Sequence, residues 1–188
     1  MAIFGQGVMG LAVTQLARLN GATVIAVDTM PRRLALVQEL GAEYTLDANA
    51  FDAAQAIKAL TNHRGADVSI EITGAYNALQ SAVRAAAYNS RVVVAGFFQG
   101  DGRGVFLGEE FHHNRIQIIA SQISGSAPRL AYRWDRLRLN QTIMQLQAQG
   151  RLKLTCLISH TFEAQQAAQA LRLLDEHTAD VVQVVLEF

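Results

Sequence analysis

The sequence predicts an α/β fold in which a six-stranded parallel sheet is doubly wound, with helices on both faces, followed by a C-terminal αβαβ tail. Two observations carry this prediction. Short apolar runs alternate with stretches of helical periodicity through residues 2–121, on the scale that right-handed crossover connections require. The pattern Gly-x-Gly-x-x-Gly at residues 5–10 follows the first apolar run and opens the first helical pattern, as expected for a strand, turn and helix unit.

Six apolar runs are expected to form the strands of this sheet. The second run, at residues 22–27, is continuously apolar, which is typical of a strand inside a parallel sheet. Glycines mark the loops between residues 96 and 108. The predicted strands are residues 2–4, 22–27, 43–46, 67–72, 91–95 and 116–121, with a possible short strand at 105–107.

The helices between the strands have recognisable beginnings and ends. The first stops at Asn20-Gly21, a favourable C-terminal signal, and Pro31 is well placed to begin the second. Residues 47–49, Asp-Ala-Asn, are expected to supply the turn and cap before the third. The predicted helices are residues 11–19, 31–40, 53–60 and 75–87.

The clearest break in the chain is the stretch Ser-Gly-Ser-Ala-Pro at residues 124–128. We therefore expect a sheet domain at residues 1–124 and a C-terminal segment at residues 125–188. This segment is apolar enough to need a packing partner. It is expected to contain a helix from Leu137 to Leu152, a strand at 154–159, a helix at 163–175 and a strand at 181–187.

The composition excludes several classes of protein. Sixteen basic and sixteen acidic residues cancel, so we expect no nucleic-acid partner and no attraction to a charged membrane surface. No apolar run is long enough to span a membrane, and no signal-like core is present. The single cysteine excludes an internal disulfide, and we expect a cytoplasmic setting.

The glycine pattern and Asp28, at the end of the second predicted strand, together make a dinucleotide-binding fingerprint. Gly5 allows the tight turn, Gly7 lets the backbone approach a pyrophosphate, and Gly10 lets the helix pack closely on the strand. The phosphates then lie at the helix N-terminus, where N–H groups are unpaired. Asp28 is expected to accept hydrogen bonds from ribose hydroxyls. The alternative is a glycine turn in an unrelated βα unit.

No residue of this chain is a candidate for catalysis or for metal binding. His112 and His113 are adjacent, so their side chains diverge, and we interpret them as loop residues. Cys156 and His160 lie too far apart along a strand to share one zinc ion. Glu71 is expected to satisfy backbone groups near the sheet edge.

These features resemble the zinc-containing medium-chain alcohol dehydrogenases, specifically their cofactor domain and C-terminal segment. The resemblance covers nearly the whole chain. The motifs that carry it are Gly-Gln-Gly-Val-Met-Gly at 5–10, Gly-Ala-Thr at 21–23, Leu-Gly-Ala at 40–42, Gly-Ala-Asp-Val at 65–68 and Ile-Ser-His-Thr-Phe at 158–162.

The resemblance implies a Rossmann fold with the cofactor along the carboxyl edge of the sheet. It implies roles for three groups of residues. Backbone phosphate contacts fall at Gln6, Gly7, Val8 and Met9, and adenosine ribose contacts at Asp28 and Arg33. Ile72, Thr73 and Gly74 match the segment beside the adenine, Ala95, Gly96 and Phe97 the strand end near the nicotinamide ribose, and Ser121 and Gln122 the neighbourhood of the carboxamide.

Only three residues lie between Met1 and Gly5, whereas a strand usually has about five or six residues. We therefore expect that part of a longer chain is missing upstream. In the resembled family an N-terminal domain of the GroES-like type supplies the zinc ligands, and none of it is in this sequence. The chain is thus expected to be the NAD-binding domain of a zinc-dependent alcohol or polyol dehydrogenase, and to be inactive alone.

NAD is preferred over NADP because the Asp28 carboxylate would repel a 2'-phosphate. Arg32 and Arg33 weaken this argument, since arginines just past the strand can hold a phosphate. Two alternatives stay open: an NADPH-dependent enoyl or quinone reductase domain that lacks zinc, and a non-catalytic cofactor-binding or assembly module.

The resembled family commonly dimerises by pairing the last strand of this sheet across a two-fold axis. The segment from Ile116 to Ala120 is the candidate edge, and an uncovered apolar edge is a pairing site in any case. The apolar C-terminal segment is expected to lack its natural cover and to cause self-association or local disorder.

Overall fold

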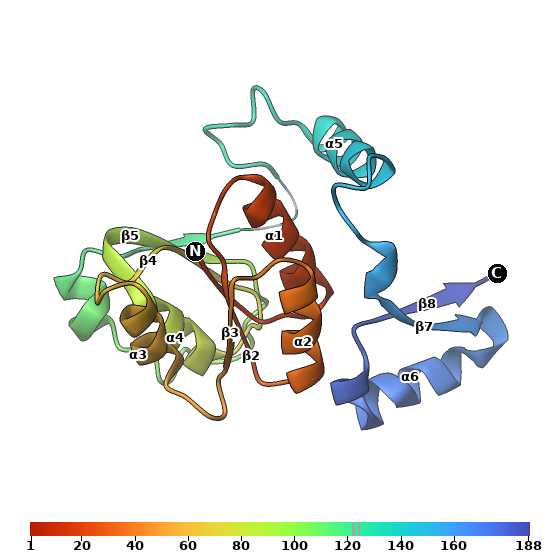
Figure 1. Ribbon diagram of the computed structural model, residues 1–188, viewed down its shortest axis with the longest axis horizontal. Helices are drawn as coiled ribbons and strands as arrows, with labels where there is room; N and C mark the ends of the chain where they lie inside the picture. Colours follow the sequence, from red (N-terminus) through yellow and green to blue (C-terminus); the bar gives the residue numbers. More distant parts are fainter. Residues whose placement is uncertain (122, 124) are drawn as a thin grey trace.

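The computed structural model describes residues 1–121, 123 and 125–188 (Figure 1). In this part of the chain, six parallel strands form one sheet in the order β3-β2-β1-β4-β5-β6. The strand order reverses between β1 and β4, which is where ligands bind in open α/β sheets. The strands are β1 (Ala2–Phe4), β2 (Ile25–Asp28), β3 (Tyr44–Asp47), β4 (Ala66–Glu71), β5 (Ala86–Val94) and β6 (Gln117–Ala120).

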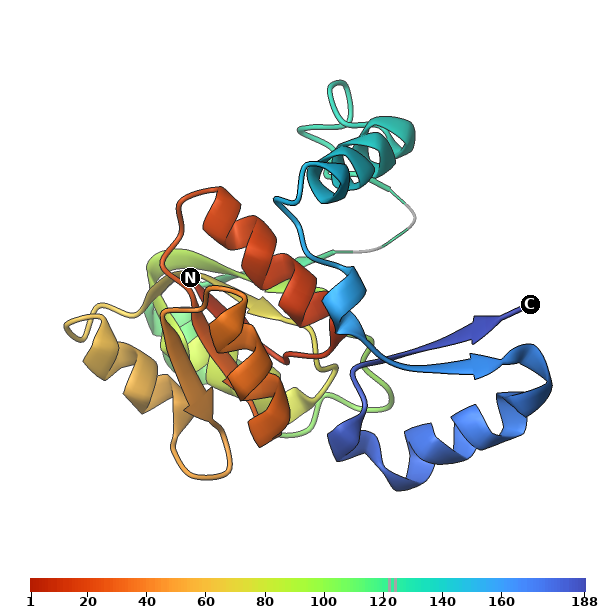
Figure 2. The same cartoon turned by 45° about the vertical axis from the view of Figure 1, so that its right-hand side comes forward.

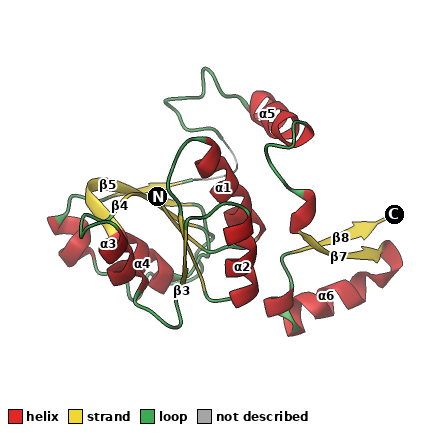
Figure 3. Cartoon of the chain, viewed as in Figure 1, coloured by secondary structure: helices red, strands yellow, loops and turns green. Residues whose placement is uncertain are grey.

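Helices cover both faces of the sheet, so the predicted Rossmann architecture is confirmed. The alternation of strands and helices along the chain is visible in Figure 3. The helices of this domain are α1 (Val8–Leu19), α2 (Pro31–Glu39), α3 (Ala53–Leu60) and α4 (Tyr76–Ala85). β5 begins at Ala86, earlier than the predicted residue 91, and α4 is correspondingly shorter than predicted.

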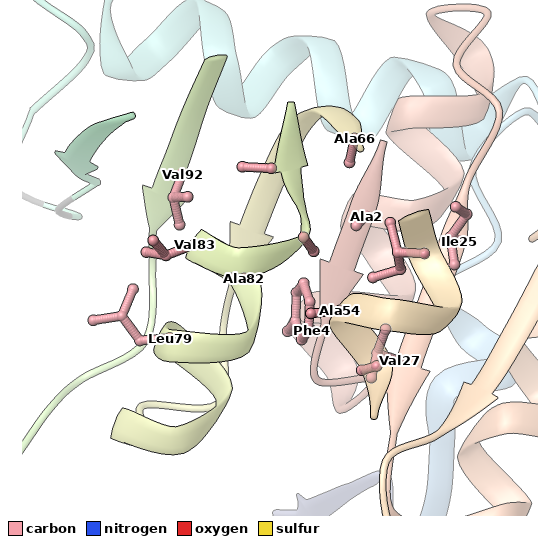
Figure 4. Close-up of a cluster of buried hydrophobic side chains, with 14 of the residues drawn as sticks. Ala2, Phe4, Ile25, Val27, Ala54, Ala66, Leu79, Ala82, Val83 and Val92 are labelled. Carbon is pink, nitrogen blue, oxygen red and sulfur yellow. The ribbon is translucent and has the colours of Figure 1, made fainter. Parts of the chain in front are cut away.

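Two apolar clusters hold the layers together, one on each face. Successive side chains of β1 point to opposite faces of the sheet, so Phe4 packs in the cluster with α3 and α4, whereas Ile3 packs in the cluster with α1 and α2. Figure 4 shows the first cluster, which includes Phe4, its register partner Val27 and Ala54 of α3. The first strand is short, but its three residues are buried, and so it anchors both halves of the core.

The cap of α3 differs from the prediction. Asp52 caps this helix, because its Oδ1 accepts hydrogen bonds from Ala54 N at 3.0 Å and Gln55 N at 3.2 Å. The predicted residues 47–49 make only a turn, in which Asn49 N donates to Asp47 Oδ1 at 2.8 Å. A cap must directly precede the first helical turn, and Asp52 satisfies that condition.

Two strand predictions were wrong. Residues 105–107 do not form a strand; Phe106 N donates to the Gln80 side chain at 2.8 Å, and a short helical segment, Leu107–Phe111, follows. Residues 154–159 were predicted as a strand, but Thr155–Leu157 is a 3₁₀ turn, and the strand β7 begins only at Ile158. In that turn Leu157 is buried beside α1 and α2, and this packing outweighs its strand propensity.

The C-terminal segment has the predicted αβαβ order and lies beside α1 and α2 (Figure 2). It consists of α5 (Arg136–Ala148), β7 (Ile158–Glu163), α6 (Ala167–Glu176) and β8 (Gln183–Glu187). β7 and β8 pair in parallel as a separate two-stranded sheet. The predicted boundary falls at residue 124, which lies outside the described residues, so the division into domains stays a prediction.

The C-terminal segment leaves large apolar side chains exposed on its helices. Leu137 and Met144 of α5 are 65% and 63% exposed, and Leu171 of α6 is 66% exposed. These helices therefore present apolar surface of the kind that marks an interaction site. No helix in the described residues combines the length and apolarity needed to cross a membrane.

Candidate functional site

The turn between β1 and α1 lies at the carboxyl end of the central strand. Gly5 has a φ of 94°, in the left-handed region, and its N–H donates to Val27 O at 2.8 Å. A Cβ at Gly10 would lie 1.9 Å from Gly5 O. Both predicted requirements for glycine, the tight turn at Gly5 and the close helix packing at Gly10, are therefore confirmed.

Gly7 is the N-cap of α1 and provides no side-chain cap. Its φ of −69° is open to any residue, and among the described residues no atom lies within 4 Å of a Cβ built there. The packing of the chain on itself therefore gives no reason for glycine at this position. Glycine is needed at this position only if another molecule approaches the backbone at the N-terminal end of α1, where unpaired N–H groups favour an anion.

Gln6 plays an internal part in the turn. Its side chain is fully buried, where Nε2 donates to Ile3 O at 2.9 Å and Oε1 accepts from the Thr14 hydroxyl at 3.2 Å. Its backbone N–H donates to Asp28 Oδ2 at 2.5 Å. The backbone N–H of Gln6 therefore points to a carboxylate and not to the predicted phosphate.

Asp28 ends β2 beside this turn and is only 7% exposed. Besides Gln6 N, its carboxylate accepts hydrogen bonds from Thr29 N and Met30 N, both at 2.8 Å. These three amides stabilise a buried negative charge at the carboxyl edge of the sheet. The position suits hydrogen bonding to ligand hydroxyls and disfavours a second anion.

A cavity of about 760 Å³ opens over the turn and Asp28. This volume is typical of a site for a small molecule or cofactor. Nine of the predicted site residues line it: Gly5, Gly7, Val8, Met9, Gly10, Asp28, Arg33, Ile72 and Thr73. The structure therefore brings the predicted phosphate, ribose and adenine segments together around one space.

The other predicted residues that the structure describes do not line this cavity. Gly96 packs against Gly74, where a Cβ at Gly96 would lie 2.3 Å from Gly74 N. Phe97 is 84% exposed, and Ser121 N donates to Val94 O at 2.7 Å just past β6. Gln122 lies outside the described residues. The predicted nicotinamide residues, Ala95, Gly96, Phe97 and Ser121, thus follow β5 and β6 at the same edge of the sheet, beyond the cavity.

Glu71 connects the segment that lines the cavity with the predicted nicotinamide residues. Its buried Oε1 accepts hydrogen bonds from Thr73 N at 2.6 Å, Gly74 N at 3.2 Å and the Thr73 hydroxyl, and burial raises the pKa of this carboxyl. Its backbone oxygen accepts from Ala95 N at 2.8 Å. The prediction that Glu71 satisfies backbone groups near the sheet edge is confirmed.

Sequence reasoning missed the outer wall of the cavity. Phe51, which is 61% exposed, lies in the loop after β3 and adds an aromatic ring. Asp52 forms an ion pair with Arg84 of α4 at 2.8 Å, and Arg84 lowers the pKa of that carboxyl. An N-cap signal before Ala53 would have found Asp52. No local signal marks its pairing with Arg84, which is distant in sequence.

The donors present do not fit a zinc ion. Among the described residues, no group of three or more His, Cys, Asp or Glu side chains could hold a metal. The Cys156 thiol lies 3.6 Å from Lys153 O, and His160 Nδ1 lies 3.0 Å from the Ser159 hydroxyl. Amide donors, a buried carboxylate and an apolar wall fit a dinucleotide instead.

The fold and this cavity define a class of protein, the Rossmann-type dinucleotide-binding domain. The family model described as zinc-binding dehydrogenase matches residues 8–137. The chain therefore belongs to the zinc-binding dehydrogenase family.

Individual relatives agree with this assignment. D-guloside 3-dehydrogenase of Escherichia coli (strain K12) is 32% identical over 191 residues, covering 100% of this chain and 54% of that protein. The alcohol dehydrogenase zinc-binding domain protein of Burkholderia ambifaria superposes with a TM-score of 0.85 at 26% identity, over 100% of this chain and 48% of that one. A putative zinc-binding dehydrogenase of Sinorhizobium meliloti, bound to NADP, has a TM-score of 0.75 and 29% identity, over 90% of this chain and 47% of that one. The chain spans about half the length of these relatives.

Proposed function

We propose that this chain is the NAD(H)-binding part of a zinc-dependent alcohol or polyol dehydrogenase. The observation that carries the proposal is the cavity in which the Gly5–Gly10 turn and the buried Asp28 carboxylate meet at the strand-order reversal. The names of the relatives support a dehydrogenase of alcohols or polyols. When bound, the nicotinamide ring exchanges a hydride with the substrate carbon.

Each part of the site has a separate task in binding. The N–H groups of Gly7, Val8 and Met9 face the pyrophosphate, and the Gln6 N–H holds Asp28 in place. Asp28 accepts hydrogen bonds from the adenosine ribose, and the Ile72–Thr73 segment and Phe51 enclose the adenine. Residues 95–97 and Ser121 lie beside the nicotinamide end.

NAD is the preferred cofactor in this proposal. A 2'-phosphate would lie against the Asp28 carboxylate, which is already negative, buried and stabilised by three amides. Calorimetric titration of the chain with NAD and with NADP tests the assignment. Tighter binding of NAD is expected. Tighter binding of NADP would overturn the cofactor assignment and favour an NADPH-dependent reductase domain.

Hydride transfer by the chain alone is not expected in this proposal. Its described residues offer no cluster of metal ligands to stabilise an alkoxide, and it spans about half the length of its relatives. Incubation with NAD and a panel of alcohols and polyols should produce no NADH, although NAD binds. NADH formation without an added partner domain would contradict this part of the proposal.

We also propose that the chain forms homodimers through β6 and that the exposed apolar surface of α5 and α6 adds to self-association. Size-exclusion chromatography with light scattering measures both, and a compact monomer would contradict them. A cytoplasmic location belongs to the same proposal, since a reducing compartment suits the exposed free thiol of Cys156.

A further inference from the structure

We infer that the C-terminal turn Thr178–Asp180, with Val181, helps to select NAD over NADP by holding the guanidinium groups of Arg32 and Arg33. The inference rests on the proposed function and concerns the same cavity. Arg32 and Arg33 are the cations nearest to Asp28 along the chain, at the start of α2. Arg33 also lines the cavity with Asp28, so it is the cation of the two that is best placed to receive a 2'-phosphate on the ribose that Asp28 binds.

Backbone carbonyls of the C-terminal turn accept hydrogen bonds from both guanidinium groups. Arg32 Nη1 donates to Asp180 O at 2.5 Å. Arg33 Nη2 donates to Val181 O at 3.2 Å and to Thr178 O at 3.4 Å. Three carbonyls from one short turn thus hold two consecutive arginines on the side of α2 that faces the C-terminal segment.

The geometry of the Arg33 contact explains its effect on phosphate binding. A guanidinium grips a phosphate through two parallel N–H groups, either Nε with Nη2 or Nη1 with Nη2. Arg33 Nη2 belongs to both pairs, and it donates to the two carbonyls. The contact therefore removes both bidentate modes while the turn stays in place.

The groups of Arg33 outside this contact do not form a phosphate-binding pair. Arg33 lines the cavity with Asp28 and Thr29, and its Nε, which is buried, has no hydrogen-bond partner among the described residues. Nε and Nη1 do not point in parallel, so without Nη2 they cannot supply the two-pronged contact that a phosphate dianion favours beside Asp28. Binding of NADP therefore requires the turn to release Arg33, whereas binding of NAD does not.

The turn is also built to hold its position. Thr178 Oγ1 donates to Leu174 O at 3.0 Å, which ties the turn to the end of α6. Val181 is 3% exposed, and Val182 packs with the α1 and α2 cluster. Loosening the turn without removing its carbonyls should therefore free the arginines and leave Asp28 and the glycine turn intact.

The test combines a loosened turn with removal of the arginines. The full chain carries Thr178→Gly, Ala179→Gly and Asp180→Gly, and NAD and NADP affinities are measured by calorimetry. We expect NADP to bind about tenfold more tightly than to the unmodified chain, since one or two charge-assisted contacts become available, and the NAD affinity to change by less than about twofold. In a chain that also carries Arg32→Gln and Arg33→Gln, the glycine substitutions should give no gain in NADP affinity.

A milder variant and an exchange measurement guard against misfolding. Asp180→Gly alone should raise NADP affinity in the same direction but by less, and Arg32→Gln with Arg33→Gln should speed amide hydrogen exchange at residues 177–183. The inference is overturned if NADP affinity does not rise in either loosened chain, or if it rises equally without the arginines. If the unmodified chain binds neither dinucleotide, the proposed function itself fails; if it binds NAD and only the gain is absent, the proposed function stands.

Discussion

The backbone N–H of Gln6 donates to the Asp28 carboxylate across 2.5 Å, which ties the glycine turn after β1 to the end of β2. The parallel register that pairs Phe4 with Val27 brings the two residues to one edge of the sheet. Asp28 therefore has two tasks in this account. It fixes the turn that approaches the pyrophosphate, and it presents the oxygens that the ribose hydroxyls need.

Substitution of Asp28 tests both tasks. Asp28→Asn keeps one acceptor oxygen, which can face either the Gln6 N–H or the Thr29 and Met30 N–H groups but not both. We therefore expect it to lower NAD affinity about tenfold and the free energy of unfolding by about 1 kcal/mol. Asp28→Ala leaves three amides without their carboxylate and should lower the free energy of unfolding by about 2 kcal/mol or more, with a larger loss of affinity. Calorimetry and urea unfolding measure the two effects. Wild-type NAD affinity in the Asn variant would contradict the ribose contact.

A methyl group at Gly10 should disrupt the packing of α1 on β1. A Cβ there would lie 1.9 Å from Gly5 O, and neither backbone segment can move without breaking the turn. We expect Gly10→Ala to reduce the free energy of unfolding by about 3 kcal/mol, although alanine ordinarily favours a helix over glycine. Gly108→Ala is the matched control, because among the described residues no atom lies within 4 Å of its Cβ. Equal urea midpoints for the two variants would show that the close approach is absent.

Glu71 should make stability depend on pH. Burial raises the pKa of this carboxyl above its ordinary value of 4.5. The folded state therefore binds the proton more tightly than the unfolded chain, and the associated stability is complete below pH 4.5 and is lost as the pH rises through the folded pKa. Arg84 lowers the pKa of Asp52, and Arg64 lowers the pKa of Asp67. These two carboxyls change the stability only as the pH falls below their ordinary pKa of 3.8, which is outside this window.

Glu71→Gln removes the titrating group while keeping an acceptor for the Thr73 amide. Urea unfolding should show that the free energy of unfolding of the wild-type chain declines as the pH rises from 4.5 to about 8. The variant should show a smaller decline over the same range. The difference between the two chains cancels the contributions of groups common to both, such as the terminal amine. Parallel curves of stability against pH for the two chains would show that folding does not raise the pKa of Glu71.

The edge strand β6 gives a prediction about assembly. Ile118 and Ile119 are 37% and 40% exposed and lie on a strand that has β5 as its neighbour on one side. We expect Ile118→Lys to dissociate a dimer formed by pairing of this edge, since charged side chains on an edge oppose strand pairing. Gln117→Lys adds the same charge at the start of the strand without removing apolar surface. An unchanged oligomer by light scattering would place the interface elsewhere.

The parts of the site that could be predicted from the sequence are those fixed by local geometry. Gly5 and Gly10 are required by a turn of six residues, and Asp28 follows a continuous apolar run, so the pattern specifies all three. Glu71 could be interpreted correctly because it too lies at the end of a strand. The alternation of strands and helices then implies that these residues share one edge of the sheet.

The rest of the site depends on contacts between distant segments. Arg84 reaches Asp52 from α4, and Arg33 reaches the C-terminal turn from α2, and no spacing in the sequence encodes either contact. Phe106 was expected in a strand, but its N–H meets the Gln80 side chain, so tertiary contacts override local propensity there. The same effect moved the start of β7 to Ile158, because Leu157 is buried beneath α1 and α2.

The most direct test of the central claim is the affinity of Gly7→Ala for NAD. The backbone at Gly7 accepts alanine without strain, and among the described residues nothing lies within 4 Å of the added Cβ. We therefore expect unfolding by urea to be unchanged within about 0.5 kcal/mol, while NAD affinity falls at least about tenfold because the methyl group occupies the space of the pyrophosphate. A folded Gly7→Ala chain that binds NAD as tightly as the unmodified chain would contradict the assignment of this turn as the dinucleotide site.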